Sequence, residues 1–267
     1  MTPTEYAARY GLTERAVYHA VCVGRIPYTR RGGRLDLEDV PPTASTRFRR
    51  PEELTDLPDY ILALIWLNGT ISGDSILIRN QDPTIPEIVA SAIRASTWDR
   101  GGRRNQKICK IGSPAICAAL RDMGFTGRKD LGRVPPPVDE LPLAKAMMES
   151  HSCLGYALQY ERHGTGDKSR AFYTPRVTLC SAPAIIDSFA LALTALGIAP
   201  LKRPAAAANG RSAVYVITSR AQLQAASRTL SPDLDGFGNR TFWDRFDAHA
   251  AEPTVPYFAY HANDERN

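Results

Sequence analysis

The chain has 267 residues and a formal net charge of +5, and 43% of its residues are hydrophobic. This length allows two domains, and the hydrophobic content excludes a wholly disordered chain. The positive charge favours an anionic partner such as nucleic acid. Only six of the 33 Lys and Arg residues are Lys, leaving 27 Arg. Arg forms paired hydrogen bonds with phosphates and guanine edges, although a GC-rich genome produces the same bias.

The cysteines and the apolar segments indicate the cellular compartment in which we expect the protein. The five cysteines are odd in number and never spaced as CxxC, so neither a disulfide framework nor a zinc site is indicated (Cys22, Cys109, Cys117, Cys153, Cys180). We find no signal peptide and no apolar run of about 18 residues. We therefore expect a soluble cytoplasmic, nucleoid-associated protein that needs no cofactor.

The first 40 residues contain two short helical segments and a hairpin. Thr2 to Glu5 form a capping box, with Thr2 as N-cap and Pro3 at the first helical position. This helix should stop at Gly11, and a second helix should run from Thr13 to Gly24. The segment 26–37 predicts a hairpin around a Gly-Gly turn that is flanked by arginines.

Residues 1–40 resemble the winged helix-turn-helix of the excisionase and MerR-like families, because both helices, the sequence GRIP and a basic wing occur in the family order. The resemblance implies that the second helix enters the major groove and that the wing contacts phosphate or the minor groove. The expected DNA contacts are Thr13, Arg15, Tyr18, His19, Arg30, Arg31 and Arg34. The alternative is a small protein-interaction domain with a solvated hairpin.

Residues 41–57 combine prolines, small polar residues and arginines without apolar periodicity. This composition predicts a linker. Its Arg50 is a candidate DNA contact, and a merely solvated tether is the alternative.

The segments 58–126 and 142–230 repeat one another. An apolar helical segment ends at Asn68-Gly69 in the first and at His151-Ser152 in the second. Each is followed by alternating apolar and polar residues typical of half-buried strands. Further along, 111–120 matches 217–226, where a strand leads through a serine N-cap into a helix.

These repeats resemble the LAGLIDADG homing-endonuclease family, in which each motif helix ends in an acid followed by Gly. The resemblance implies an α+β fold in which the order αββαββα occurs twice in one chain. The motif helices would pack along a pseudo-twofold axis, and saddle-shaped sheets would lie in the major groove of double-stranded DNA. The alternative is another α+β domain with accidental periodicity.

In that architecture the basic residues along the strands and hairpins would contact DNA, and a single chain would bind as a monomer. The candidates are Arg79, Arg103, Arg104, Lys107, Lys110, Arg162, Lys168, Arg170, Arg176, Lys202, Arg203 and Arg211. Solvated charged faces are the alternative interpretation.

The acid positions of both motifs are altered, to Asn68 and His151. Mg²⁺ prefers anionic carboxylate ligands, so both metal sites would be impaired. Glu149 should point roughly 200° away from position 151 on a helix. We therefore expect no catalytic residues and a sequence-specific, non-cleaving DNA-binding protein, such as a repressor of a phage or mobile element. The alternatives are a nicking endonuclease with rearranged acids and an excisionase-like recombination factor.

The segment 231–267 is too aromatic for a free linker. We expect its rings to pack back onto the core, namely Phe237, Phe242, Trp243, Phe246, Tyr257, Phe258 and Tyr260.

Overall fold

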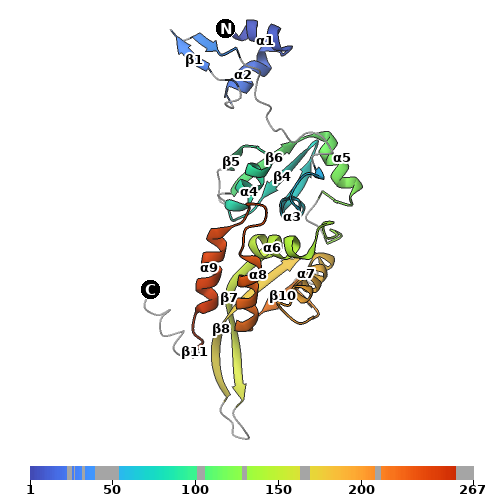
Figure 1. Cartoon of the computed structure of the whole chain (residues 1–267), viewed down its shortest axis with the longest axis vertical. Coiled ribbons are helices and arrows are strands. Elements are labelled where there is room, and N and C mark those ends of the chain that lie inside the picture. The colour runs from blue at the N-terminus through green and yellow to red at the C-terminus, as the bar shows by residue number, and fades with distance from the viewer. Residues whose placement is uncertain are drawn as a thin grey trace. The chain divides into compact units, whose positions relative to one another are not determined.

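The computed structural model describes residues 1–22, 26, 28–31, 34–39, 54–100, 106–127, 131–162, 169–207 and 212–256 (Figure 1). The chain divides into two compact units, residues 1–47 and 48–267. Tyr257, Phe258 and Tyr260 lie outside the described residues.

The first unit consists of two helices and a two-stranded hairpin: α1 (Pro3–Tyr10), α2 (Glu14–Cys22), β1 (Tyr28–Arg31) and β2 (Arg34–Leu37). The predicted capping box is present, since the Thr2 hydroxyl accepts from the Glu5 amide at 3.3 Å and the Glu5 carboxylate accepts from the Thr2 amide at 2.8 Å. Gly11 ends α1 in the left-handed conformation that glycine adopts without strain. A small core contains Tyr6, Val17, Ile26 and Leu37.

The second unit contains the order αββαββα twice, as the sequence predicts. The first repeat comprises α3 (Asp59–Asn68), β3 (Gly69–Ser72), β4 (Ser75–Arg79), α4 (Thr84–Ala92), β5 (Thr97–Arg100), β6 (Gln106–Gly112) and α5 (Pro114–Asp122). The second comprises α6 (Glu140–His151), β7 (Ser152–Arg162), β8 (Ser169–Ser181), α7 (Pro183–Ala195), β9 (Ala205–Ala206), β10 (Ala213–Ile217) and α8 (Arg220–Leu230). The helix α9 (Arg240–Ala251) and the short strand β11 (Val255–Pro256) follow.

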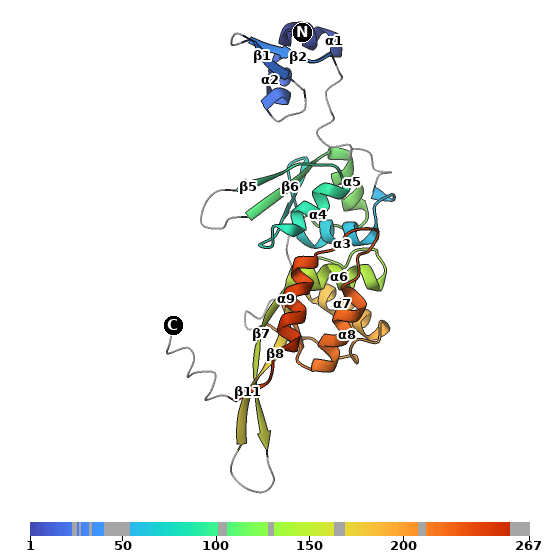
Figure 2. The same cartoon turned by 60° about the vertical axis from the view of Figure 1, so that its left-hand side comes forward.

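Each repeat forms one antiparallel sheet with equivalent strand order. The first sheet has the order β3-β4-β6-β5, and in the second β7 pairs with β8, which pairs with β10 and then β9. In the second sheet β7 and β8 form a long hairpin (Figure 2), and β11 adds to β8 at Phe172 and Tyr173. The fold is therefore mixed α+β with antiparallel sheets.

Burial alternates along the strands and distinguishes two faces of each sheet. In β4, Ile76 and Ile78 are buried, whereas Ser75, Leu77 and Arg79 are half-buried. In β10, the buried residues alternate with half-buried valines in the same way. We call the face that bears the buried residues the helix face, because helices pack on it, and the opposite face the open face.

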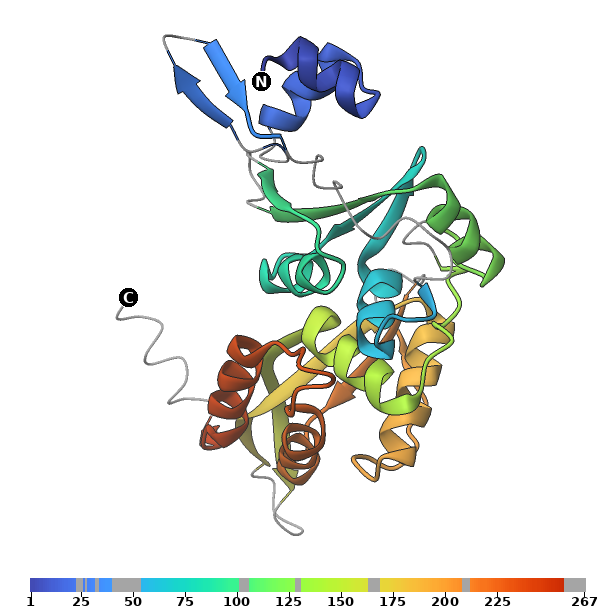
Figure 3. The ribbon, with the colours of Figure 1, turned by 45° about the horizontal axis from the view of Figure 1, so that its top comes forward.

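The two repeats meet through α3 and α6, which lie side by side at their junction (Figure 3). Every residue of α3 from Tyr60 to Asn68 is buried. A helix that is apolar on all sides belongs inside a large core. No helix among the described residues is both long and apolar enough to span a bilayer.

The sequence misplaces several elements of this unit. The sequence predicts strands at about 103–111 and at 198–204 in these repeats, whereas β5 lies at Thr97–Arg100 and β9 at Ala205–Ala206. It does not predict the helix α9. The aromatic side chains of α9 do pack on the core as expected, because Phe242, Trp243 and Phe246 are buried in it. Leu54 is also buried there, so the end of the segment predicted as a linker packs on the second unit.

Candidate nucleic-acid interface

A cleft of about 910 Å³ opens where the C-terminal ends of α3 and α6 meet. The first repeat contributes Asn68 and Gln106 together with the segment 79–84, and the second contributes residues 149–154. Thr241, Phe242 and Arg245 of α9 complete the wall. The two positions that would hold acids in the resembled family, Asn68 and His151, therefore lie in one cleft.

The Asn68 side chain is buried, and the protein itself engages both of its polar atoms. Its Nδ2 donates to the Leu64 carbonyl at 3.1 Å, and its Oδ1 accepts from Asn80 Nδ2 at 2.9 Å. Asn80 Nδ2 also donates to the Ser150 carbonyl at 2.9 Å and so links the two repeats. The residue after Asn68 must be small, because a Cβ on Gly69 would lie 2.4 Å from the Ile65 carbonyl oxygen.

His151 is half-buried at the end of α6, and Ser150 fixes its tautomer. The Ser150 hydroxyl donates to the Ala146 carbonyl at 2.6 Å and lies 2.8 Å from His151 Nδ1. Because the single hydroxyl hydrogen goes to Ala146, the imidazole Nδ1 must carry the hydrogen of this second contact. Like Asn68, His151 contributes no carboxylate to the cleft.

Glu149, the nearest acid on α6, belongs to a buried network. Its Oε1 lies 2.8 Å from Lys145 Nζ, and both side chains are fully buried. The same oxygen accepts from Trp243 Nε1 at 2.6 Å and from the Asn239 amide at 3.3 Å. Tyr60 donates to Oε2, and desolvation by burial together with this carboxylate raises the pKa of Tyr60. The carboxylate thus joins α3, α6 and α9, and it is already saturated with donors.

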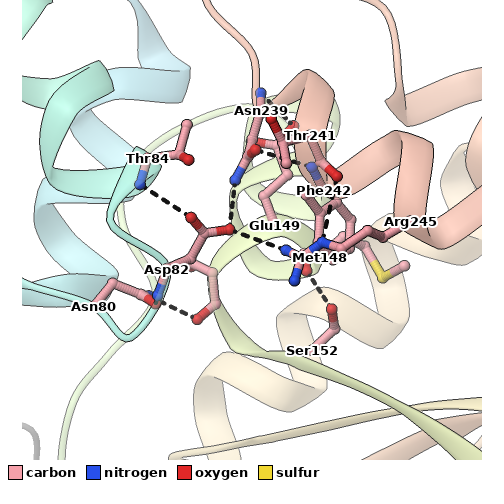
Figure 4. Close-up of polar contacts among 11 residues, drawn as sticks. Asn80, Asp82, Thr84, Met148, Glu149, Ser152, Asn239, Thr241, Phe242 and Arg245 are labelled. Carbon is pink, nitrogen blue, oxygen red and sulfur yellow. Dashed lines mark hydrogen bonds and ion pairs between the residues drawn. The ribbon is translucent and has the colours of Figure 1, made fainter. Parts of the chain in front are cut away.

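Asp82, the other acid of the cleft, is also paired (Figure 4). Its Oδ2 accepts from Asn239 Nδ2 at 3.0 Å and lies 3.3 Å from Arg245 Nη2, and its Oδ1 accepts from the Thr84 amide at 3.0 Å. These contacts tie the turn between β4 and α4 of the first repeat to α9, which packs on the second.

The donor set of this cleft does not fit a pair of catalytic divalent metals. Mg²⁺ requires oxygen ligands, and two-metal sites depend on carboxylates. Asn68 offers an amide oxygen that already accepts a hydrogen bond, His151 offers nitrogen, and Glu149 is committed to Lys145. Within the described ranges, no group of three or more His, Cys, Asp and Glu is placed to hold a metal ion.

A buried guanidinium caps the C-terminal end of α3. Arg133 lies in the segment between the repeats, and its Nη1 donates to the carbonyls of Trp66 at 2.7 Å and Leu67 at 3.1 Å. Its Nη2 donates to the Gly69 carbonyl at 3.0 Å. The Trp66 and Leu67 carbonyls lie in the last turn of α3 and have no partner within the helix, and the positive charge also suits the negative end of the helix dipole.

The predicted basic contacts divide between the two faces of the sheets. Arg79, Lys110 and Arg176 occupy open-face positions, since each alternates with residues that are buried on the helix face. Lys107 is placed differently from the expectation. It shares its face with Cys109, whose partner in β4 is Ile78, and its ammonium pairs with Glu87 of α4. Strand alternation thus directs Lys107 to the helix face.

The structure locates some of the remaining predicted contacts. Exposed side chains are Thr13, Arg15, Tyr18, His19, Arg34, Lys202 and Arg203. Arg30, Arg31, Arg162 and Arg170 lie in strands, but only their backbone is described. Arg50, Arg103, Arg104, Lys168 and Arg211 fall outside the described residues.

Sequence reasoning missed the residues that hold the cleft together, namely Asn80, Asp82, Arg133, Lys145, Asn239 and Arg245. Two of them carried a local signal. Asn239 is an N-cap residue before an aromatic segment, and its side chain accepts from the Phe242 amide at 3.0 Å. Lys145 and Glu149 are an i,i+4 pair of opposite charge in the otherwise apolar stretch 143–149 of α6.

No family model and no curated protein matches the chain. Solved structures with some similarity include the I-LtrWI LAGLIDADG homing endonuclease bound to target DNA, at 9% identity and a TM-score of 0.46, covering 75% of this chain and 90% of that one. Another is the LAGLIDADG meganuclease I-AabMI bound to uncleaved DNA, at 7% identity and a TM-score of 0.45, covering 73% and 90%. These values are too low to assign the chain to a family.

Proposed function

We propose that this chain binds double-stranded DNA in a sequence-specific manner and does not cleave it. The observation that carries the proposal is the chemistry of the cleft between α3 and α6. The ends of both central helices meet there as Asn68 and His151, and the protein engages both polar atoms of Asn68 internally. The two repeats resemble a DNA-binding fold, and this resemblance suggests double-stranded DNA as the partner. The altered acid positions argue against hydrolysis of the phosphodiester bond.

Charge on the open faces supports DNA as the partner. Lys110 and Arg176 are exposed there, and Arg79 lies beside the cleft. Cations at such positions neutralise phosphates and release counterions, which is the main sequence-independent term in DNA binding. We further propose that the first unit is a winged helix-turn-helix that reads a short element beside the site of the second unit. One chain would then bind one long asymmetric site as a monomer.

Binding without cleavage leaves DNA intact and occupied, which suits a transcriptional repressor. A reporter that carries the selected site in its promoter tests this role. Expression of the protein should lower reporter output, and variants that lose DNA binding should lose this effect.

The experiment that tests the proposal is selection of bound duplexes from a random pool, followed by a nicking assay on a supercoiled plasmid that contains the selected site. The purified full chain should bind the site and leave the plasmid supercoiled in Mg²⁺ and in Mn²⁺. Nicking that requires metal would overturn the non-cleaving part of the proposal, and failure to enrich any duplex would overturn the whole of it.

Asp82 is the observation that favours the endonuclease alternative, because its carboxylate lines the same cleft as Asn68 and His151. If nicking occurs, the isosteric variant Asp82→Asn should abolish it only if this acid has taken over a catalytic position. Glu149 is unsuitable for this test, since its substitution would remove the buried partner of Lys145.

A further inference from the structure

The open face of the second sheet is lined by small side chains that end in methyl groups. Its described positions include Ala157 of β7, Thr174 and Thr178 of β8, and Val214 and Val216 of β10. All five are half-buried, whereas the alternating residues Val177, Leu179 and Tyr215 are buried on the helix face. Methyl groups therefore remain accessible on a sheet face that also bears the exposed Arg176.

Strand register makes this surface continuous. Thr178 pairs with Cys153 on one side and with Val216 on the other. Val214 pairs with Cys180, and Ala157 pairs with Thr174. Residues on adjacent strands are about 5 Å apart, and residues two apart along a strand are about 6.6 Å apart. The second spacing is close to two base-pair steps of about 3.4 Å.

The corresponding surface of the first sheet carries more hydrogen-bonding side chains. Its open-face positions include the hydrogen-bonding residues Ser72, Ser75, Arg79, Gln106 and Lys110 alongside the apolar residues Leu77, Ile108 and Trp98. Arg, Lys and Gln recognise guanine and adenine edges in the major groove, whereas methyl-bearing side chains contact the thymine methyl group. A G·C pair offers no methyl group to such a surface in the major groove.

We propose that the second sheet recognises a thymine-rich half of the DNA site by contacts between methyl groups, while the first sheet recognises its half by hydrogen bonds. This inference rests on the proposed function, and it specifies which bases the second repeat selects. Thr178, Val214 and Val216 are the specificity-determining residues, and Arg176 anchors the same surface to phosphate.

The experiment uses the full chain and the selected duplex, with thymine replaced by deoxyuridine in one half at a time. Deoxyuridine keeps every hydrogen-bonding group and removes only the C5 methyl. Burial of one methyl corresponds to about a fourfold change in affinity at most, at about 0.8 kcal/mol per group. Replacement of thymine in the half bound by the second sheet should therefore weaken binding about two- to fourfold per contacted thymine. Replacement in the half bound by the first sheet should have little effect.

Paired serine variants assign the sensitive half to the second repeat. Thr178→Ser removes one methyl and keeps the hydroxyl, and it should reduce the penalty of deoxyuridine at one position. The matched control Thr70→Ser removes the same group from the open face of the first sheet and should leave that penalty unchanged. If the duplex binds but is indifferent to deoxyuridine, or only Thr70→Ser alters the response, this inference is wrong and the proposed function stands. If no duplex binds, the proposed function itself fails.

Discussion

Replacement of Glu149 should destabilise the second unit strongly, because its carboxylate neutralises a buried ammonium. Lys145 and Glu149 are both fully buried, and the other contacts of the ammonium are uncharged: the Leu230 carbonyl at 2.9 Å and the Tyr60 and Trp243 rings, each with its centroid 5.5 Å away. Removing one member of a buried ion pair costs about 3–5 kcal/mol, since the other charge stays buried without its counter-charge. The volume-conserving variant Glu149→Leu should therefore lower the free energy of unfolding of this unit by about that amount.

The control is the double variant Lys145→Met/Glu149→Leu, which removes both charges. It should be less destabilised than Glu149→Leu alone, since replacement of both partners by apolar groups leaves no unpaired buried charge. Trp243, Tyr60 and the Asn239 amide still lose an acceptor, so wild-type stability is not expected to return in full.

Denaturant unfolding followed by tryptophan fluorescence measures these differences. All three tryptophans (Trp66, Trp98, Trp243) lie in the second unit, so the signal reports that unit alone. The reasoning is refuted if Glu149→Leu stays within about 1 kcal/mol of wild type. It is also refuted if the double variant is less stable than the single one.

Four further predictions concern charge, two thiols and the helix cap. Lys110→Ala should lower the slope of log affinity against log salt concentration by about one unit. Lys107→Ala should leave this slope unchanged, because Lys107 pairs with Glu87 on the helix face. The opposite pattern would reverse our assignment of faces. Bound DNA should protect the exposed Cys153 from a maleimide, and equal labelling of free and bound protein would place the DNA elsewhere. Burial raises the pKa of Cys109 to about 12, so this thiol should stay protonated and unlabelled up to about pH 9, as mass spectrometry can check. Arg133→Met should lower the same fluorescence-detected stability by about 2–4 kcal/mol, because it leaves buried carbonyls without donors; a change below about 1 kcal/mol would show that another group caps α3.

The sequence predicts the order of elements well because each repeat carries local periodic signals. The run from Tyr60 to Asn68 is apolar enough to identify a buried helix, and Ser113 is an N-cap that the structure confirms, since its hydroxyl accepts from the Ile116 amide at 3.3 Å. The face occupied by Lys107 was not predictable in the same way. It depends on strand register, and a shift of one residue exchanges the two faces.

Contacts between distant segments could not be predicted from the sequence, for a different reason. Asp82 meets Arg245 across 163 positions of the chain, and no local pattern at either residue encodes that pairing. The sequence predicts the cleft as two altered helix ends, Asn68 and His151. It does not predict the partners that α9 and its N-cap residue bring to the acids of the cleft, namely Asn239, Trp243 and Arg245. Only the folded chain brings those groups together.

The position of Arg133 dictates where this protein could be divided into two separately expressed fragments. Although Arg133 precedes α6 closely in sequence, its guanidinium completes the end of α3. A break just after α5, the last helix of the first repeat, would place Arg133 in the second fragment. The C-terminal end of α3, in the first fragment, would then stay uncapped until the two fragments associate. A break in the segment 134–139 keeps that cap with its helix. Complementing fragments should therefore assemble best when the cut follows Arg133 and precedes Glu140.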